Sequence, residues 1–381
     1  MIAVGLGLAL AADSLRRVYA VGQEANDHFV AALVLGCQGF YVVQALAAPP
    51  WLAPAMLVGL VWTWGFFFCV HREGPTPRWA RWLLGVPSQL AYAWALWAGL
   101  VWLLRAPVAL AMGWDVWWAG PLNLLPLALA LVGWLDCYGR AGRLHRHALP
   151  GLPAPVAHLS DLHVSPLLHR AELDALVDRV NALEPAVVVI TGDLVMPFSE
   201  REHGYLLDAL ARLRAPTFAC PGNHDLPVLE RLRAELAGVG VRMLVDESVT
   251  VAGLAITGVN FHWREARTRL DKALERLPPG DDAYRVLLAH DPRLGAWVPD
   301  GRFDLVLSGH THGGHVAGNA LGLPGSVLRL AGIRDQGWWP AGSGRQFVHR
   351  GNWSTGLPPR MGVAAEVVLL EPQASSNTTG A

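Results

Sequence analysis

Four long apolar stretches in the first third of the chain constrain its fold more than any other feature. They contain no Lys, Arg, Asp or Glu, and they cover residues 28–48, 51–70, 83–104 and 117–135. Each has about the 20 residues that a helix needs to cross the hydrocarbon layer of a bilayer. We therefore expect a bundle of about four transmembrane helices within residues 1–146.

The composition of the whole chain agrees with a membrane protein. Of its 381 residues, 52% are hydrophobic and only 16% are charged. The formal net charge of −1 gives no reason to expect nucleic-acid binding, which requires a basic face. The four cysteines show no paired spacing, and we interpret them as isolated apolar residues.

Arginine placement predicts the orientation of this bundle. With four spans, one side carries eight flanking arginines and the other side only Arg105; the eight are Arg16, Arg17, Arg72, Arg78, Arg81, Arg140, Arg143 and Arg146. Positive charge favours the cytoplasmic side, so the chain after residue 140 is expected in the cytoplasm. The spans hold no ionisable side chain, which argues against an ion-coupled transporter and favours an anchor. A lipid-accepting groove between the helices is the alternative.

After a Pro/Gly-rich linker at 147–155, the pattern of the sequence changes. Short apolar runs alternate with stretches at helical spacing, which indicates an α/β layer architecture. The expected strands are 155–160, 186–191, 217–220, 286–289 and 304–308, and the expected helices include 173–183, 205–213 and 229–236. Apolar runs at 244–257 and 347–370 predict a second, mixed sheet. The small, polar tail at 372–381 is expected to be disordered.

Polar side chains follow five of these expected strands. In chain order the sequences DLH, GD, GNHD, H and GHTH begin at Asp161, Gly192, Gly222, His290 and Gly309. Ligands gather at the carboxyl ends of strands in open α/β sheets, so these groups are expected at one edge. Carboxylate, amide and imidazole groups bind Mn²⁺, Fe²⁺ or Zn²⁺ where thiolates are absent. Seven such ligands suit two ions that share a carboxylate.

The five blocks, in this order, resemble the calcineurin-like metallophosphoesterases over roughly residues 155–371. The GHTHGG form after membrane helices is similar to a bacterial branch that includes UDP-2,3-diacylglucosamine hydrolases, and to animal transmembrane proteins with a metallophosphoesterase domain. The resemblance implies a four-layer α/β/β/α sandwich at 156–371 behind the membrane helices. It also implies a bacterial inner-membrane location and a connection with lipid A biosynthesis.

The resemblance further implies a ligand set for two divalent ions (Mn²⁺, Fe²⁺ or Zn²⁺). The first ion would be held by Asp161, His163, Asp193 and His312. The second would be held by Asp193, Asn223, His290 and His310, with Asp193 bridging the two. His224 would protonate the leaving oxygen, because an unperturbed imidazole pKa of about 6.5 suits that task near neutral pH.

One departure from the family pattern concerns His224. Many relatives carry an Asp that orients the acid histidine at the position where this chain has Met196. Three alternatives remain at the level of the sequence. Either Asp225 or Asp161 supplies the orienting contact, or His224 acts unassisted and more slowly.

The substrate pocket departs from the pattern as well. VHRGNW stands near the C-terminus, where the branch tends to have V-S-R-G-x-G, and it leaves Arg350 and Arg360 as candidates for binding a phosphate oxygen. His315, where relatives often carry Gln, is a candidate substrate contact or a polar loop residue. The tryptophans at 338–339 and Trp353 are candidates either to seat an acyl chain or a base, or simply to pack.

These features predict a membrane-anchored, dinuclear metal-dependent phosphoesterase. It would hydrolyse a phosphodiester or pyrophosphate bond of a lipid- or nucleotide-linked substrate by means of a metal-bridging hydroxide. Its expected partners are that phosphoester substrate and the membrane. The alternative is a non-catalytic metal-binding scaffold or sensor at the membrane; the intact ligand set argues against it, and Met196 argues weakly for it.

Overall fold

The chain forms two compact units, each of which is described separately. The computed structural model describes residues 2–19, 24–47, 53–70, 77–113, 124–135, 142–165, 168, 170–196, 203–276, 283–322, 325–353 and 360–373. The first unit consists of Met1–Asp136, Ser165–Leu167 and Thr355–Met361. The second consists of Cys137–Val164, Leu168–Ser354 and Gly362–Ala381.

The first unit is helical. Its elements are α1 (Ile2–Tyr19), α2 (Glu24–Ala47), α3 (Ala53–Val70), α4 (Arg78–Ala80), the π-helical η1 (Arg81–Gly85), α5 (Val86–Ala111) and α6 (Leu124–Trp134). Helix α2 packs against α1 and α3, and α5 packs against α3 and α6. Large apolar side chains of α5, such as Leu103, Leu104 and Leu110, are exposed. An apolar outer face of this kind is characteristic of contact with lipid or with another protein surface.

One helix among the described residues, Arg81–Ala111, is long and apolar enough to cross a membrane. It has 31 residues, and an 18-residue stretch within it has a mean hydropathy of 1.5. The other three expected spans contain shorter apolar helical segments, at Val34–Leu46, Ala53–Gly65 and Leu125–Trp134. The length and composition of these helices alone do not establish that they span a membrane, so the four-span bundle stays a prediction.

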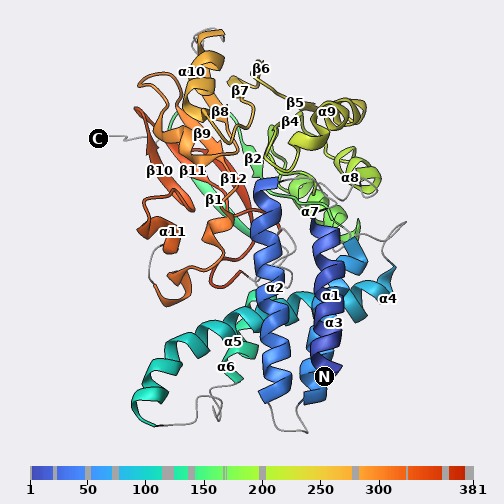
Figure 1. The fold of residues 1–381 in the computed structure, drawn as a ribbon. Coiled ribbons are helices and arrows are strands. Elements are labelled where there is room, and N and C mark those ends of the chain that lie inside the picture. The colour runs from blue at the N-terminus through green and yellow to red at the C-terminus, as the bar shows by residue number, and fades with distance from the viewer. Residues whose placement is uncertain are drawn as a thin grey trace. The chain divides into compact units, whose positions relative to one another are not determined.

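The second unit contains two six-stranded mixed sheets (Figure 1). The first has the order β1-β12-β2-β3-β4-β5 and is formed by Arg143–Leu149, Glu366–Pro372, Val156–Leu159, Val187–Thr191, Thr217–Cys220 and Val241–Met243. The second has the order β10-β11-β9-β8-β7-β6 and is formed by Gly337–Ala341, Gly344–Val348, Leu305–Ser308, Tyr284–Leu288, Leu254–Gly258 and Glu247–Val251. Strands β2, β3 and β4 run parallel, as do β7, β8 and β9, so their carboxyl ends share one side of each sheet.

Helices cover the outer faces of both sheets. The longer ones are α7 (Arg170–Ala182), α8 (His203–Leu210), α9 (Leu229–Gly238) and α10 (Ala266–Arg276). Short helical turns are η4 (Leu226–Val228), η5 (Pro292–Ala296), η6 (His312–Gly314), η7 (Gly318–Leu321) and α11 (Val327–Leu330). The helices predicted at 173–183, 205–213 and 229–236 are therefore confirmed, except that α7 ends at Ala182 and α8 ends at Leu210.

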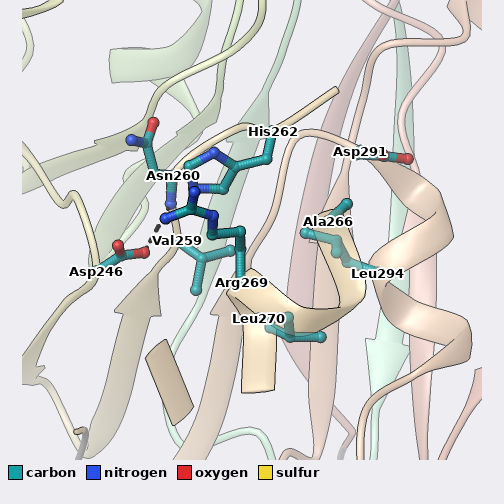
Figure 2. Close-up of a pocket in the computed structure, with 9 residues that line it drawn as sticks. All are labelled: Asp246, Val259, Asn260, His262, Ala266, Arg269, Leu270, Asp291 and Leu294. Atoms are coloured by element: carbon teal, nitrogen blue, oxygen red, sulfur yellow. Dashed lines mark hydrogen bonds between the residues drawn. The ribbon is translucent and has the colours of Figure 1, made fainter. Parts of the chain in front are cut away.

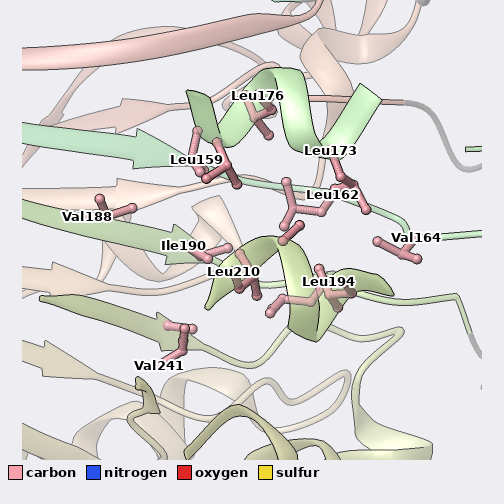
Figure 3. Close-up of a cluster of buried hydrophobic side chains, with 14 of the residues drawn as sticks. Leu159, Leu162, Val164, Leu173, Leu176, Val188, Ile190, Leu194, Leu210 and Val241 are labelled. Atoms are coloured by element: carbon pink, nitrogen blue, oxygen red, sulfur yellow. The ribbon is translucent and has the colours of Figure 1, made fainter. Parts of the chain in front are cut away.

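Alternation along the strands builds separate cores. In β3, Val188 and Ile190 pack against α7, α8 and α9 (Figure 3), whereas Val187 and Val189 pack against the second sheet, because successive side chains of a strand point to opposite faces. A third core joins α10 to the second sheet through Leu270 and its neighbours. Each fully buried Val, Leu or Ile stabilises the fold by about 1.5–3 kcal/mol. The layers follow as helices, sheet, sheet and helix, which agrees with the expected α/β/β/α sandwich.

Two segments differ from the expectation. Strand β1 begins at Arg143, so the first sheet starts inside the region 1–146 and includes the first three residues of the expected linker 147–155. Its polar, partly exposed sequence carries no hydrophobic pattern, because it is an edge strand. The run 347–370 is divided between the sheets: β11 belongs to the second, but β12 pairs with β1 and β2 in the first. Of the tail 372–381, residues 374–381 lie outside the described residues.

Candidate metal centre

The polar side chains that follow the strands converge at the carboxyl ends of both sheets. β2, β3 and β4 of the first sheet lead into Asp161, Asp193 and Asn223, and β8 and β9 of the second lead into His290 and His310. The expectation of a single sheet edge is thus corrected, because two sheets contribute. The sandwich brings their strand ends together, and the ligand candidates lie between them.

One group of possible ligands consists of Asp161, His163 and His312. The Nε2 atoms of His163 and His312 lie 2.9 Å apart, and the His312 Nε2 lies 3.3 Å from Asp161 Oδ1. The Nδ1 atom of His312 lies 3.1 Å from the carbonyl oxygen of Trp353. If Nδ1 donates its proton there, the tautomer leaves Nε2 as the atom that can bind a cation.

A second group consists of Asp193, His290 and His310. The Nε2 atom of His290 lies 3.1 Å from Asp193 Oδ2, and its Nδ1 atom lies 2.6 Å from the carbonyl oxygen of Thr191, an acceptor that fixes the Nδ1–H tautomer. The backbone N–H of His310 donates to the carboxylate of Asp161, at 3.1 and 3.2 Å from its two oxygens. The two groups are therefore directly connected.

Asp193 is a member of the second group and lies close to the first as well. Its Oδ2 lies 3.6 Å from His163 Nε2 as well as 3.1 Å from His290 Nε2, and its Oδ1 accepts a hydrogen bond from the backbone N–H of His224 at 2.9 Å. A third possible ligand group, His163 with Asp193 and His224, also includes this carboxylate. One carboxylate between two imidazole sets has oxygens that two neighbouring cations could share.

The donor set fits divalent metal ions. Asp161, Asp193 and His290 are at most 2% exposed, so their charges are withdrawn from water. The Oδ1 atom of Asn223 is buried and accepts no hydrogen bond from any residue that the structure describes. Buried acceptors in native proteins normally have a partner, and a cation bound beside Asp193 would supply it. Sulfur is absent from the possible ligand groups of the described residues, although Cys220 is the last, fully buried residue of β4.

Sharp backbone turns hold the ligand candidates in place. Five of the seven adopt positive φ angles: Asp161 (54°), His163 (42°), Asp193 (53°), His310 (74°) and His312 (49°). This left-handed region is sterically disfavoured for residues with a side chain, although Asp and His tolerate it better than most. At Gly222, moreover, a Cβ atom would overlap Oδ1 and the backbone nitrogen of Asp193. Only glycine permits this close approach of the two loops.

Asp225 contacts backbone amides rather than His224. Its Oδ1 accepts hydrogen bonds from Leu194 N and Val195 N at 2.9 and 3.2 Å, and its Oδ2 accepts one from Gly222 N at 2.9 Å. Asp225 therefore ties the loop after β3 to the loop after β4. The Nδ1 atom of His224 is buried and makes no hydrogen bond within the described part of the chain. Among the three alternatives of the sequence, this geometry favours an unassisted His224.

Burial and neighbouring charges shift the proton affinities of the site. Burial lowers the pKa of His224 to about 4, below the ordinary imidazole value. Burial also lowers the pKa of His290, but the Asp193 carboxylate more than offsets this and raises it to about 10. Burial, together with the charge of Asp193, raises the pKa of Asp225 to about 7. For Asp193 itself, the imidazoles, chiefly His290, outweigh burial and hold the pKa below its usual range.

The expected substrate contacts lie in different environments. His315 stacks on His312, with ring centroids 5.1 Å apart, so it borders the ligand candidates. The guanidinium of Arg350 is paired with Glu366, since Nε lies 3.7 Å from Oε2. Arg360 is fully buried and belongs to the first compact unit. Their roles toward a phosphate stay predictions.

The tryptophans considered as substrate seats are largely packing residues. Trp353 is 5% exposed and belongs to the core between the first sheet and its helices. Trp338 packs on Phe347, and Trp339 lies under the guanidinium of Arg329 at 4.5 Å. What the sequence reading missed is the role of the Trp353 carbonyl, which orients His312.

Comparison with known proteins agrees with this geometry. The family model described as calcineurin-like phosphoesterase matches residues 154–314. A protein of Aquifex aeolicus (strain VF5), named an uncharacterized metallophosphoesterase, is 32% identical over 237 residues, which are 60% of this chain and 88% of that protein. The chain belongs to the calcineurin-like phosphoesterases. This membership places its second unit among hydrolases that act on phosphoester bonds.

Two further relatives of this chain carry more specific names. A bovine (Bos taurus) transmembrane protein with metallophosphoesterase domain is 31% identical over 244 residues, covering 57% of this chain and 52% of that protein. Phosphodiesterase YaeI of Escherichia coli (strain K12) is 29% identical over 209 residues, covering 50% of this chain and 72% of that protein. The chain spans only 52% to 58% of the length of several curated relatives that it matches.

Proposed function

We propose that this protein is a dinuclear metal-dependent phosphoesterase that hydrolyses a phosphodiester or pyrophosphate bond. The observation that carries the proposal is the position of Asp193, whose Oδ2 lies 3.1 Å from His290 Nε2 and 3.6 Å from His163 Nε2. A carboxylate placed between two imidazole sets suits two cations that share it. The name of the E. coli relative, a phosphodiesterase, supports the same reaction class.

In this proposal each ion has four protein ligands. Asp161, His163, Asp193 and His312 hold one ion, and Asp193, Asn223, His290 and His310 hold the other. When bound, the pair of divalent cations supplies a nucleophilic hydroxide from water near neutral pH and neutralises charge on the phosphoryl oxygens. Since four of the seven donors are imidazoles and sulfur is absent, Mn²⁺, Fe²⁺ and Zn²⁺ fit the set better than Mg²⁺ or Ca²⁺.

The role of His224 follows from its position beside Asp193. The Asp193 Oδ1 atom accepts the backbone N–H of His224, which fixes this residue next to the shared carboxylate. With a pKa of about 4, the imidazole is neutral at pH 7 before substrate arrives. A bound phosphoester brings negative charge toward the ring, which raises its pKa, and the protonated ring then gives its proton to the leaving oxygen.

The first unit is proposed as a membrane anchor that keeps the hydrolase domain in the cytoplasm. Support comes from the 31-residue apolar helix Arg81–Ala111 and from the transmembrane relative of Bos taurus. The surplus of arginines on one side of the predicted spans supports the cytoplasmic placement. An anchored site acts on substrates at the bilayer, so lipid-linked and nucleotide-linked phosphoesters are the substrate classes to test first.

The test compares the full-length, detergent-purified protein with two matched Asp variants, using Mn²⁺ and bis(p-nitrophenyl) phosphate. Asp193→Asn keeps the shape but removes the shared charge, and we expect turnover to fall by about 10³-fold or more. Asp208→Asn is the control, because Asp208 lies in α8 with its side chain 58% exposed. Equal turnover of wild type and Asp193→Asn would overturn the proposal. Stoichiometric Mn²⁺ binding without turnover on lipid, sugar-nucleotide and cyclic-nucleotide esters would favour a scaffold or sensor.

A further inference from the structure

The segment after β7 forms an aromatic wall beside the candidate metal ligands. Phe261 is 2% exposed, and its ring centroid lies 5.8 Å from that of His290 and 5.5 Å from that of His310. Trp263 packs edge-to-face on Phe261 at 4.9 Å and lies 5.8 Å from His310. The segment after β7 is thus a sixth strand end near the site. None of the five polar sequence motifs lies there, because its side chains at the site are aromatic.

Trp263 is exposed even though it is anchored on this wall. Its exposed fraction is 58%, which is the largest among the tryptophans of the second unit that the structure describes as exposed. A solvent-exposed indole does not gain the free energy that burial would give. An ordered and exposed indole next to a candidate reaction centre therefore indicates a binding surface. Phe261 and His310 contact the indole from the protein side, and the rest of the ring remains accessible.

Hydrogen bonds hold this segment rigidly. The backbone N–H of Asn260 donates to Asp246 Oδ1 at 3.0 Å, and that of Phe261 donates to Asn260 Oδ1 at 2.8 Å. A small cavity lies beside this segment, and Figure 2 shows Asn260, His262 and Arg269 gathered along it. Aromatic residues 261 and 263 thus contact the metal-ligand side, whereas polar residues 260 and 262 line the cavity.

We propose that Trp263 is a platform on which the protein stacks a planar ring of its substrate, so that its preferred phosphoesters carry a nucleobase. This inference rests on the proposed function, because it assumes that the phosphoryl group binds beside His310. Indole faces stack on the π-face of any base. The neighbouring cavity is lined by apolar side chains such as Leu270 and by polar groups such as Asn260 and Arg269, and the polar groups suit the donors and acceptors of a heterocycle.

Direct binding tests this inference without requiring turnover. Adenosine 5′-monophosphate and inorganic phosphate are titrated by calorimetry into the full-length, Mn²⁺-loaded protein. Both ligands offer a phosphoryl group, and only the nucleotide offers a base. We expect wild type to bind the nucleotide about tenfold more tightly than phosphate, which is within the range of one stacked base.

Three variants assign that preference to a residue. Trp263→Ala is expected to reduce the preference to less than about twofold, and Trp263→Phe to retain most of it, because a phenyl ring still stacks. Trp339→Ala is the matched control. Trp339 lies in β10 and stacks under Arg329, so the loss of its indole should leave the preference unchanged. Manganese content and the unfolding temperature of each variant show that the metal site and fold are intact.

The outcomes separate this inference from the proposed function. If Trp263→Ala keeps the wild-type preference, or if wild type shows none, the stacking role is refuted even where the protein hydrolyses phosphodiesters. A preference lost in Trp339→Ala instead would refute it as well. A Trp263-dependent preference in a protein that turns over no phosphoester would support the stacking site and overturn the hydrolase.

Discussion

Gly222→Ala should separate metal binding from overall folding. A Cβ atom at this position would overlap both Oδ1 and the backbone nitrogen of Asp193. To restore ordinary van der Waals contact, which begins at 3.4 Å from a Cβ atom, the Asp193 loop must move by about 1 Å. Backbone atoms are involved, so a side-chain rotation alone cannot relieve the overlap.

The displacement is large compared with the tolerance of a metal site. Metal–ligand distances in proteins vary by only about 0.2 Å, so a shift of about 1 Å removes the shared carboxylate from productive coordination. Changes that merely misorient a ligand cost about 10–100-fold in metal affinity, and here the ligand itself moves. We therefore expect Mn²⁺ affinity to fall at least 100-fold, with a loss of stability of about 1–3 kcal/mol from overpacking.

Calorimetric Mn²⁺ titration and urea unfolding of the full-length protein measure the two quantities. Gly204→Ala is the matched control, because Gly204 lies in α8 with no atom within 4 Å of the added Cβ, and alanine should stabilise the helix by about 0.5–1 kcal/mol. Wild-type affinity and stoichiometry in Gly222→Ala would refute the view that the close approach of these loops positions the shared carboxylate.

Three further predictions concern the buried titratable groups. Asp225→Asn is expected to lower the free energy of unfolding in urea by about 2 kcal/mol, because the new NH₂ group must face backbone N–H donors whichever way the amide is turned. A loss of stability as small as that of the exposed Asp208→Asn would contradict this. His290 has a pKa of about 10, raised above its ordinary value, so the metal-free folded protein holds a proton on it at pH 8 that coordination displaces. Mn²⁺ affinity should accordingly rise with pH up to about 10, and calorimetry in buffers of different ionisation enthalpy should detect proton release that is absent in His290→Gln. His224→Gln should lower kcat by about 10²-fold or more with unchanged manganese content, and an unchanged kcat would exclude proton donation by this residue.

The polar motifs could be predicted because each follows a short apolar run that forms a strand. The stretches before Asp161, Asp193 and Asn223 are buried strands of the first sheet, and the ends of such strands are where ligands gather. The sequence could not predict that the other candidates come from a second sheet, because strand order is decided by pairing between distant segments. β12 shows this most clearly, since it follows β11 in the chain but joins the opposite sheet.

Electrostatic properties were the least predictable part of the site. The pKa of His224 depends on burial by elements far from it in the chain, which a local motif does not reveal. The contacts of Asp225 could not be predicted either, since its three partners are backbone amides, which every residue type except proline provides. Phe261 and Trp263 lack the polar groups by which the other strand ends were recognised.

The left-handed turns at the metal centre place the ligand side chains but lower the stability of the fold. A residue with a side chain in such a conformation costs about 1 kcal/mol or more relative to glycine, and five of the candidate ligands adopt it. Glycine at His163 or His312 would relax the backbone but delete an imidazole. Substitutions selected for thermal stability alone would therefore first replace these metal-ligand residues. The free energy gained by burying the hydrophobic cores must offset the conformational strain of the five turns.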